Sequence, residues 1–508
     1  MGDNELLDTL QQREQFREHY WHKKDPILQE RLLWRAQTFR QLIHLLPGQS
    51  ILELGCGSGV FTRELHRVSK SENPITAVTF QEQVPEEPEK SLIEFLSLSS
   101  FPGPLQNKTF DHIIIMDLVD ETNSSWFLEN VYALLKPGGQ VTFYESNPKN
   151  PFLKGRNFLN RFSNKTDRRK LLSRSELSRS VREAGFVNVV AVYNDFVYAP
   201  LTPKGVWWLR NLSTLLENLS PIDSFAGAIL LHAQKAPQET IEPNQSLCQH
   251  KELAGAVSVV VPCHNEEMNI TSLVTGLLTF YGDYLHEIIL VDDNSKDNTR
   301  CVIEQLAEKY PLIKPVFRKP PNGVGRAIRD GYRVATGKYI LSMDCDFQHL
   351  LPELRDIFNA AVRGVDVAIG SRFSRRSVLL NYPFQKIIAN RGFHFLARLI
   401  LGKKFRDLTN NLKLIRKEVV DNLQLTQTDF AINAETGLMP LLMGYRVREV
   451  PISWVNRTPD MGVSSFKLFK VGGGYWRVLY QLWVKKMFNN NSYYPAIRLK
   501  GVKKVQLP

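Results

Sequence analysis

No stretch of the 508-residue sequence reaches about 18 consecutive apolar residues, the length that a membrane-spanning helix needs. The amino-terminal stretch MGDNELLDTLQQREQ is polar and lacks the features of a signal peptide. The five cysteines are scattered and form no C-x-x-C pair, which indicates free thiols in a reducing compartment. These absences predict a protein that is made and kept in the cytoplasm.

Acidic residues are missing from one region. Between Met461 and Pro508 there is no Asp or Glu, and Lys and Arg alternate there with Phe, Tyr and Trp. The whole chain has a net charge of +12, which predicts an anionic partner. Basic and aromatic residues together favour peripheral binding to the anionic, cytoplasmic face of a membrane. A solvated basic surface is the alternative, and no signature of a nucleic-acid-binding fold supports a nucleic-acid partner.

The composition is that of a globular protein, with 43% apolar and 23% charged residues, and the length predicts two or three domains. Strand-like and helical patterns alternate in both halves, so we expect an α/β protein with two doubly wound domains. The expected parts are a helical segment (1–46), a first domain (47–236), a linker (237–254), a second domain (255–475) and a basic aromatic tail (476–508). The first segment reads either as a helical lid on the first domain or as an arm that binds a partner.

The first domain begins with a predicted strand, a glycine-rich turn and a helix. The sequence is Ser50-Ile-Leu-Glu-Leu-Gly-Cys-Gly-Ser-Gly59, followed by Val-Phe-Thr-Arg-Glu-Leu. Glycines allow a tight turn and the close approach of a ligand, and the start of the helix offers N–H groups to a carboxylate or phosphate. Further strands are expected at 75–80, 93–98, 112–116 and 141–145.

Residues 40–235 resemble a class I S-adenosylmethionine-dependent methyltransferase. The E-L-G-C-G-S-G turn, a later L-L-K-P-G-G-Q turn and E-A-G-F at 183–186 follow the order of that family. The resemblance implies that Glu53, Gly55, Gly57 and Gly59 line the site of S-adenosylmethionine, with Asp117 as a further candidate. The family ends its second strand with an acid that holds the ribose, whereas here the first acid after that strand is Glu82. The domain is therefore either a working methyltransferase or a degenerate domain kept as a scaffold.

In the second half, polar motifs follow three successive predicted strands. V-P-C-H-N-E-E ends the strand at 257–261, V-D-D-N-S ends the strand at 287–291, and M-D-C-D-F-Q-H ends the strand at 339–342. The carboxyl ends of parallel strands are where open α/β sheets bind ligands. Asp344, Asp346 and Gln348 alternate in extended backbone and offer three oxygens that suit Mg²⁺ or Mn²⁺. Taken alone, the motif could also be a solvated Asp-rich turn that caps the next helix.

These motifs, with N-G-V-G-R-A-I-R at 322–329, resemble a family 2 inverting glycosyltransferase of GT-A fold, on the branch of the dolichyl- or polyprenyl-phosphate sugar synthases. The resemblance implies a nucleotide-diphosphate sugar as donor and a polyprenyl or dolichyl phosphate as acceptor. It places Pro262, His264, Glu266, Asp293 and Arg372 around the donor, and Asp344, Asp346 and Gln348 on the metal. It places Lys386 and Asn390 on the acceptor phosphate, and Arg457 and Lys467 on a basic loop over the diphosphate.

The acceptor end departs from the family pattern. Asn390 stands where the family has a hydroxyl, and Asn410-Asn411 replaces a Ser-Gly pair. A lipid phosphate is already a nucleophile at neutral pH, whereas a sugar hydroxyl needs a base, for which Asp346 and Glu435 are candidates. The alternative function, a polysaccharide glycosyltransferase fused to a methyltransferase that modifies the glycan, therefore remains possible at this stage. The basic, apolar segment 391–400 reads as a helix, either at a membrane interface or in the core.

Overall fold

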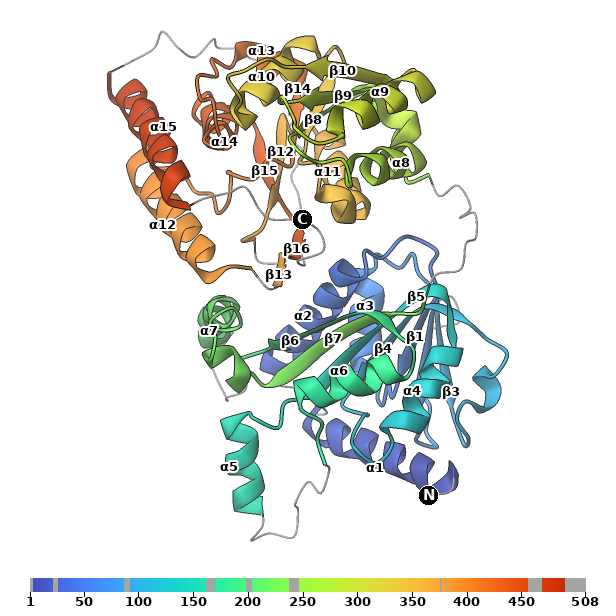
Figure 1. The fold of residues 1–508 in the computed structure, drawn as a ribbon. Helices are drawn as coiled ribbons and strands as arrows, with labels where there is room; N and C mark the ends of the chain where they lie inside the picture. The colour runs from blue at the N-terminus through green and yellow to red at the C-terminus, as the bar shows by residue number, and fades with distance from the viewer. Residues whose placement is uncertain are drawn as a thin grey trace. The chain divides into compact units, whose positions relative to one another are not determined.

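A computed structural model describes residues 3–21, 26–85, 92–160, 170–197, 203–236, 246–374, 377–380, 382–455 and 468–488. The chain forms two compact units (Figure 1). The first comprises residues 1–243 together with 376–387 and 453–462, and the second comprises 244–375, 388–452 and 463–508.

The first unit is built on a seven-stranded sheet of order β3-β2-β1-β4-β5-β7-β6. All neighbouring strands are parallel except β7, which runs antiparallel to β5 and β6. Its strands are β1 (Ile51–Leu54), β2 (Ile75–Thr79), β3 (Ile93–Ser97), β4 (Phe110–Met116), β5 (Leu135–Ser146), β6 (Val187–Asn194) and β7 (Ala228–Gln234). The predicted strands at 75–80, 93–98 and 112–116 are present to within two residues at their ends. The strand predicted at 141–145 is longer, because β5 begins six residues earlier at Leu135.

Helices cover both faces of this sheet. Buried side chains of α2 and α3 share one core cluster with β1 and β4, and those of α4 and α6 share another. The helices are α1 (Asp3–Trp21), α2 (Pro26–Leu42), α3 (Val60–Val68), α4 (Ser124–Ala133), α5 (Pro151–Asn160), α6 (Arg174–Glu183) and α7 (Pro203–Leu216). The helical segment predicted at the start of the chain is therefore two helices, α1 and α2.

The second unit holds a seven-stranded sheet of order β10-β9-β8-β11-β14-β12-β15, in which β14 runs antiparallel to both neighbours. Its strands are β8 (Val257–Cys263), β9 (Leu285–Asp292), β10 (Ile313–Phe317), β11 (Tyr339–Ser342), β12 (Val367–Ser371), β14 (Lys413–Arg416) and β15 (Val447–Pro451). Two short strands, β13 (Val378–Leu380) and β16 (Ser453–Val455), pair in parallel and belong to the first unit.

Helices of the second unit also lie on both faces of its sheet. Its helices are α8 (Ile270–Tyr281), α9 (Thr299–Lys309), α10 (Val324–Val334), α11 (Leu354–Val362), α12 (Phe384–Leu401), α13 (Lys417–Asn422), α14 (Ile432–Leu442) and α15 (Leu468–Phe488). The start of α12, up to Ile387, is grouped with the first unit. Side chains of α10, α14, α12 and α15 share one core cluster with β8, β9 and β12. The predicted fold class, α/β with two doubly wound domains, is confirmed.

Among the described residues, no helix combines the length and the apolarity needed to cross a membrane.

Candidate functional site

The glycine-rich turn of the first unit joins β1 to α3, as the sequence predicts. Gly55, Gly57 and Gly59 have φ values of 74°, 52° and 72°, in the left-handed region that favours glycine. A β-carbon at Gly55 would lie 2.8 Å from Leu118 Cδ1, and one at Gly59 would lie 2.7 Å from Phe95 Cζ. Any residue with a side chain at these positions would therefore clash with its neighbours, so the turn requires glycine.

Glu53, on β1, is completely buried under this turn. Its Oε2 accepts a hydrogen bond from Thr62 Oγ1 at 2.7 Å, while Oε1 is buried and has no hydrogen-bond partner among the described residues. Burial raises the pKa of Glu53 to about 7. The glycine cradle and the unpaired Glu53 oxygen together fit a small polar cofactor such as S-adenosylmethionine.

The N–H groups of this turn are not free, which corrects the prediction that they are open to a ligand. Gly57 N donates to Glu14 Oε1 at 2.8 Å, and Ser58 N donates to Glu18 Oε2 at 3.1 Å. Both carboxylates come from α1, which the sequence did not single out. A β-carbon at Gly57 would overlap the Glu18 side chain.

The other two predicted cofactor residues lie at the ends of β2 and β4. Glu82 is exposed, and it is Glu14 Oε2 that accepts from Phe80 N at the end of β2, at 2.8 Å. Asp117 has a φ of 55°, and its Oδ1 accepts from Ser146 N at 2.8 Å, so it ties the end of β4 to the end of β5. The roles of Glu82 and Asp117 toward a cofactor stay predictions.

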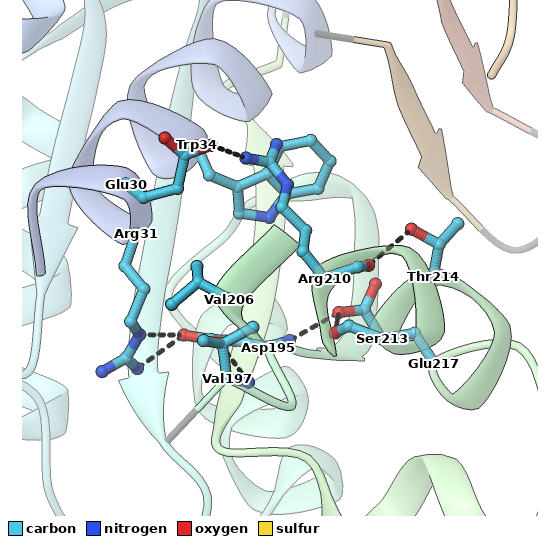
Figure 2. Close-up of a pocket in the computed structure, with 10 residues that line it drawn as sticks. All are labelled: Glu30, Arg31, Trp34, Asp195, Val197, Val206, Arg210, Ser213, Thr214 and Glu217. Carbon is cyan, nitrogen blue, oxygen red and sulfur yellow. Dashed lines mark hydrogen bonds and ion pairs between the residues drawn. The ribbon is translucent and has the colours of Figure 1, made fainter. Parts of the chain in front are cut away.

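A small cavity lies near the end of β6, walled by α2 and α7 (Figure 2). Arg31 Nε donates to Asp195 Oδ2 at 2.9 Å, and Asp195 N donates to Glu217 Oε1 at 2.7 Å. The Arg210 guanidinium stacks 3.8 Å from the centre of the Trp34 ring. Burial raises the pKa of Glu217 to about 7. The volume is about 20 Å³, room for one water molecule, so these charged groups hold α2 and α7 in place.

In the second unit, the motifs after β8, β9 and β10 meet at Asp293. Its N–H donates to Cys263 O at 2.8 Å, and its Oδ2 accepts from Gly323 N at 2.6 Å. Its Oδ1 accepts from Arg318. The predicted donor motifs V-P-C-H, V-D-D-N-S and N-G-V-G are thus joined through one carboxylate.

Two other predicted donor residues lie on the loop after β8. His264 Nδ1 lies 3.0 Å from Asp293 O. Glu266 N donates to Thr299 Oγ1 at 2.8 Å, and Glu266 Oε2 accepts from Asn269 Nδ2 at 2.6 Å. Pro262 is the penultimate residue of β8.

The glycines of N-G-V-G make room for a neighbouring chain segment. Gly323 has a φ of 155°, and a β-carbon there would overlap Thr428 O. A β-carbon at Gly325 would lie 2.7 Å from Gln427 O. The carboxylate of Glu435 holds that segment, because it accepts from Thr426 N at 2.9 Å and from Gln427 N at 3.0 Å.

The D-C-D motif directly follows β11, as predicted. Asp344 Oδ1 accepts from Asn411 Nδ2 at 2.7 Å, and Asn411 Oδ1 accepts from Ser342 Oγ at 2.8 Å. Asn411, which departs from the family pattern, therefore fixes the orientation of one carboxylate of the motif. The prediction that Asp344, Asp346 and Gln348 alternate in extended backbone is wrong, because the chain turns at 345–346 and continues into the 3₁₀ helix η5 (Phe347–Glu353). The side chain of Gln348 falls outside the described part of the chain.

Within the described residues, no three His, Cys, Asp or Glu side chains are grouped to hold a metal ion by themselves. Two neighbouring carboxylates on a strand end nevertheless fit a hard cation whose remaining ligands are phosphate oxygens.

A buried ion pair lies beside this motif. Arg372 Nε and Nη2 donate to the two oxygens of Asp407 at 2.8 and 3.0 Å. Burial would raise the pKa of Asp407, but the Arg372 guanidinium holds it well below its usual range. Arg372 Nη2 also lies 3.3 Å from Thr409 Oγ1, to which Asn390 Nδ2 donates at 3.2 Å. The structure thus brings the predicted donor residue Arg372 and the predicted acceptor residue Asn390 onto one threonine.

The two predicted acceptor residues, Asn390 and Lys386, both lie on α12. The Oδ1 atom of Asn390 is buried and has no hydrogen-bond partner among the described residues. Lys386 lies one turn earlier on α12 and is half-buried. Arg457 and Lys467, predicted to lie over the diphosphate, fall outside the residues that the structure describes.

A buried lysine lies beneath the same edge and was not singled out by the sequence. Lys413, on β14, is completely buried and its Nζ donates to Asn433 O at 3.0 Å. Burial lowers the pKa of its ammonium group to about 7, while Asp407 and Asp344 favour the charged form.

Comparison with known proteins agrees with this division of the chain. The glycosyl transferase family 2 model matches residues 258–424, and a methyltransferase domain model matches residues 51–139.

Two curated relatives match the second half. The dolichol-phosphate mannosyltransferase of Pyrococcus furiosus is 31% identical over 202 residues, which cover 39% of this chain and 56% of the Pyrococcus protein. The match thus spans little more than half the length of that relative. The polyprenol monophosphomannose synthase of Mycolicibacterium smegmatis is 28% identical over 219 residues, 41% of this chain and 79% of the relative.

Among solved structures, glucosyl-3-phosphoglycerate synthase from Mycobacterium tuberculosis in complex with Mn²⁺ and uridine-diphosphate-glucose is similar at 16% identity and a TM-score of 0.35, over 48% of this chain and 83% of that chain. The chain thus matches a methyltransferase domain in its first half and glycosyl transferase family 2 in its second half.

Proposed function

We propose that the second domain transfers a glycosyl group from a nucleotide-diphosphate sugar to the phosphate of a polyprenyl or dolichyl lipid, with Mg²⁺ or Mn²⁺. The observation that carries this proposal is the convergence of polar groups at one edge of the second sheet. Asp293 lies at the end of β9, Asp344 at the end of β11 and Arg372 at the end of β12. The names of the two curated relatives support a lipid phosphate as acceptor.

At the donor end, Pro262, His264, Glu266 and Asp293 would bind the nucleotide. Asp344, Asp346 and Gln348 would hold the metal, which neutralises the charge that develops on the departing diphosphate. Asn411 keeps the Asp344 carboxylate in one orientation, so that little reorganisation accompanies binding. Arg457 and Lys467 would add positive charge to the diphosphate.

At the acceptor end, a lipid phosphate fits the chemistry better than a sugar hydroxyl. The phosphate is largely ionised at neutral pH and needs no general base. Of the two candidate bases, Glu435 already accepts hydrogen bonds from Thr426 and Gln427, which supports a structural role for it. Lys386 and Asn390, one turn apart on α12, would bind the phosphate.

The helices α12 and α15 give this domain a surface suited to a membrane. The Phe393 and Tyr475 rings lie 5.3 Å apart, and Lys486 Nζ donates to Leu401 O at 3.0 Å, so the two helices pack together. Large apolar side chains stay exposed on both: Ile388, Phe395 and Leu399 on α12, and Trp476, Tyr480, Trp483 and Met487 on α15. With the basic residues of α15, this surface supports peripheral attachment to the cytoplasmic face of a membrane.

The first domain would bind S-adenosylmethionine at the glycine turn. Calorimetry with S-adenosylmethionine tests this, and Gly57→Arg should abolish binding because the added side chain fills the cradle.

The test of glycosyl transfer is a product assay. Purified full-length protein is incubated with radiolabelled nucleotide sugars, polyprenyl phosphate and Mn²⁺, and label is counted in the organic phase. We expect a labelled lipid with at least one donor, and none in EDTA. Label in a soluble glycan, with no labelled lipid from any donor, would instead support a polysaccharide glycosyltransferase.

A further inference from the structure

The first helix of the chain lies across the carboxyl ends of β1, β2 and β4, which is the edge where an open α/β sheet binds its ligand. Arg17 donates to Met116 O at 2.8 Å and also to Gly55 O. Glu14 accepts from Gly57 N and Phe80 N, both at 2.8 Å. These partners are backbone groups at strand ends, so α1 binds the edge itself.

The α1 carboxylates use the groups that an anionic or hydroxyl-bearing ligand would need. Glu14 Oε2 also accepts from Thr79 Oγ1 at 3.0 Å, and Glu18 Oε2 accepts from Ser58 N at 3.1 Å. Gly57 leaves no space beneath the helix, since a β-carbon there would overlap Glu18. A ligand and α1 therefore cannot occupy the turn together.

The contact is specific and mainly polar. Arg13, Glu14, Arg17 and Glu18 are exposed by only 3%, 0%, 4% and 7%. Arg13 donates to Leu118 O and pairs with Asp120, while Leu10 packs into the core of the first unit. Burying four charged side chains of one helix is costly unless each finds a partner, and the strand ends supply those partners.

We propose that α1 is an internal competitor for the cofactor crevice, so that S-adenosylmethionine binds only when α1 leaves the glycine turn. The proposal rests on the proposed cofactor site of the first domain. At the end of β2, Glu14 accepts from both Phe80 N and Thr79 Oγ1, so this strand end is covered by α1 as well. The opposite interpretation, in which Glu14 is a ligand of the cofactor, predicts the opposite sign for the same substitution.

The test is calorimetry with S-adenosylmethionine on the full-length wild type and the Glu14→Gln and Glu18→Gln variants. Glutamine keeps the size of the side chain but loses the charge and one of the accepting oxygens that face backbone N–H groups. We expect each variant to bind the cofactor at least tenfold more tightly than the wild type does. Glu5→Gln is the matched control, because Glu5 lies on the same helix and is exposed, and it should bind as the wild type does.

Hydrogen exchange of the α1 amides, measured on the same proteins, gives a second readout. Without cofactor, exchange should be faster in Glu14→Gln than in the wild type, and saturating cofactor should speed it in the wild type. Weaker binding by Glu14→Gln, or slower α1 exchange in the complex, would overturn the proposal. A variant with fast α1 exchange that still binds no cofactor would overturn it as well. Glycosyl transfer by these variants reports separately on the second domain.

Discussion

The two domains build their ligand edges from the same element, the carboxyl ends of parallel strands, and differ in what holds the polar groups there. In the first domain, the backbone donors of the glycine turn are bound by Glu14, which lies 43 residues earlier in the chain. In the second, Asp344 is held by Asn411 and Asp407 by Arg372, all from strand ends and loops of the same edge. The edge of the first sheet is covered by helix α1, whereas the polar side chains at the edge of the second sheet are held by hydrogen bonds to one another.

The difference separates two uses of buried polar contacts. Contacts such as Asn411 to Asp344 fix a side chain in the orientation that a ligand requires, so they survive binding. Contacts such as Glu14 to Gly57 N take the donors that a ligand requires, so they must break before binding. The first domain therefore adds the cost of releasing α1 to every binding event, which lowers its apparent affinity.

The largest expected effect is on the rate of glycosyl transfer and comes from a substitution at the edge of the second sheet. Asp344→Asn should lower the rate of glycosyl transfer by about 10³-fold, because it removes one charge from the proposed metal site. Asp421→Asn, an exposed change elsewhere in the domain, is the control. Initial rates of lipid labelling measure the effect, and a loss of less than tenfold would count against a metal at this motif.

The next effect concerns stability. Asp407→Asn leaves the buried Arg372 guanidinium without its counter-charge and should lower the free energy of unfolding by about 3–5 kcal/mol. The same control, Asp421→Asn, disrupts an exposed pair with Lys417 and should cost less than about 1 kcal/mol. Urea unfolding followed by circular dichroism compares them. Equal losses would show that the second edge is not braced by this pair.

A smaller effect tests the acceptor. If the acceptor is a lipid phosphate, Lys386→Ala should raise its KM by about 10- to 100-fold, since a charged hydrogen bond to phosphate is lost. Asn390→Ser, which restores the hydroxyl of the family pattern, should not raise that KM. Steady-state kinetics with varied polyprenyl phosphate measures both. An unchanged KM in Lys386→Ala would favour a hydroxyl acceptor.

A change of pH contrasts the two domains. Lys413 has a pKa of about 7 in the folded protein, below its usual value, so the unfolded chain binds more protons above pH 7. Its contribution to stability therefore rises as the pH rises from about 7 to 10. Lys413→Met should flatten this rise in Tm. Persistence of the full rise in the variant would contradict the burial of a titrating lysine.

Glu53 and Glu217 of the first domain act in the opposite direction. Burial raises the pKa of each to about 7, so the folded state binds more protons than the unfolded state between about pH 4.5 and 7. Their contribution to stability falls as the pH rises through that interval. Glu217→Gln should weaken this fall, which scanning calorimetry of the first domain measures.

The fold could be predicted from the sequence because its signals are local. Apolar runs set the strands, and the glycines of 55–59 and 323–325 stand where positive φ or close approach excludes a β-carbon. The positions of Asp293, Asp344 and Arg372 followed from the rule that polar motifs at strand ends share an edge.

A helical lid on the first domain is one of the two interpretations of the first segment, but the α1 residues that cover this edge could not be predicted. Glu14 and Glu18 lie on a helix and accept hydrogen bonds from backbone N–H groups. Since almost every residue has such a group, the sequence does not indicate which ones the two carboxylates bind. The one available signal was negative: no acid follows β2 before the exposed Glu82. Asn411 departs from the family pattern, yet the structure gives it a role, because its amide bridges Ser342 and Asp344.

The most direct test of the contrast between a braced edge and a covered edge is calorimetry on one preparation of the full-length wild type. Uridine diphosphate and guanosine diphosphate are titrated with Mn²⁺, and S-adenosylmethionine is titrated separately. The account predicts that at least one nucleotide binds in a Mn²⁺-dependent way and that S-adenosylmethionine binds at least tenfold more weakly. S-adenosylmethionine binding as tightly as the nucleotide, with the wild-type α1 sequence intact, would contradict it.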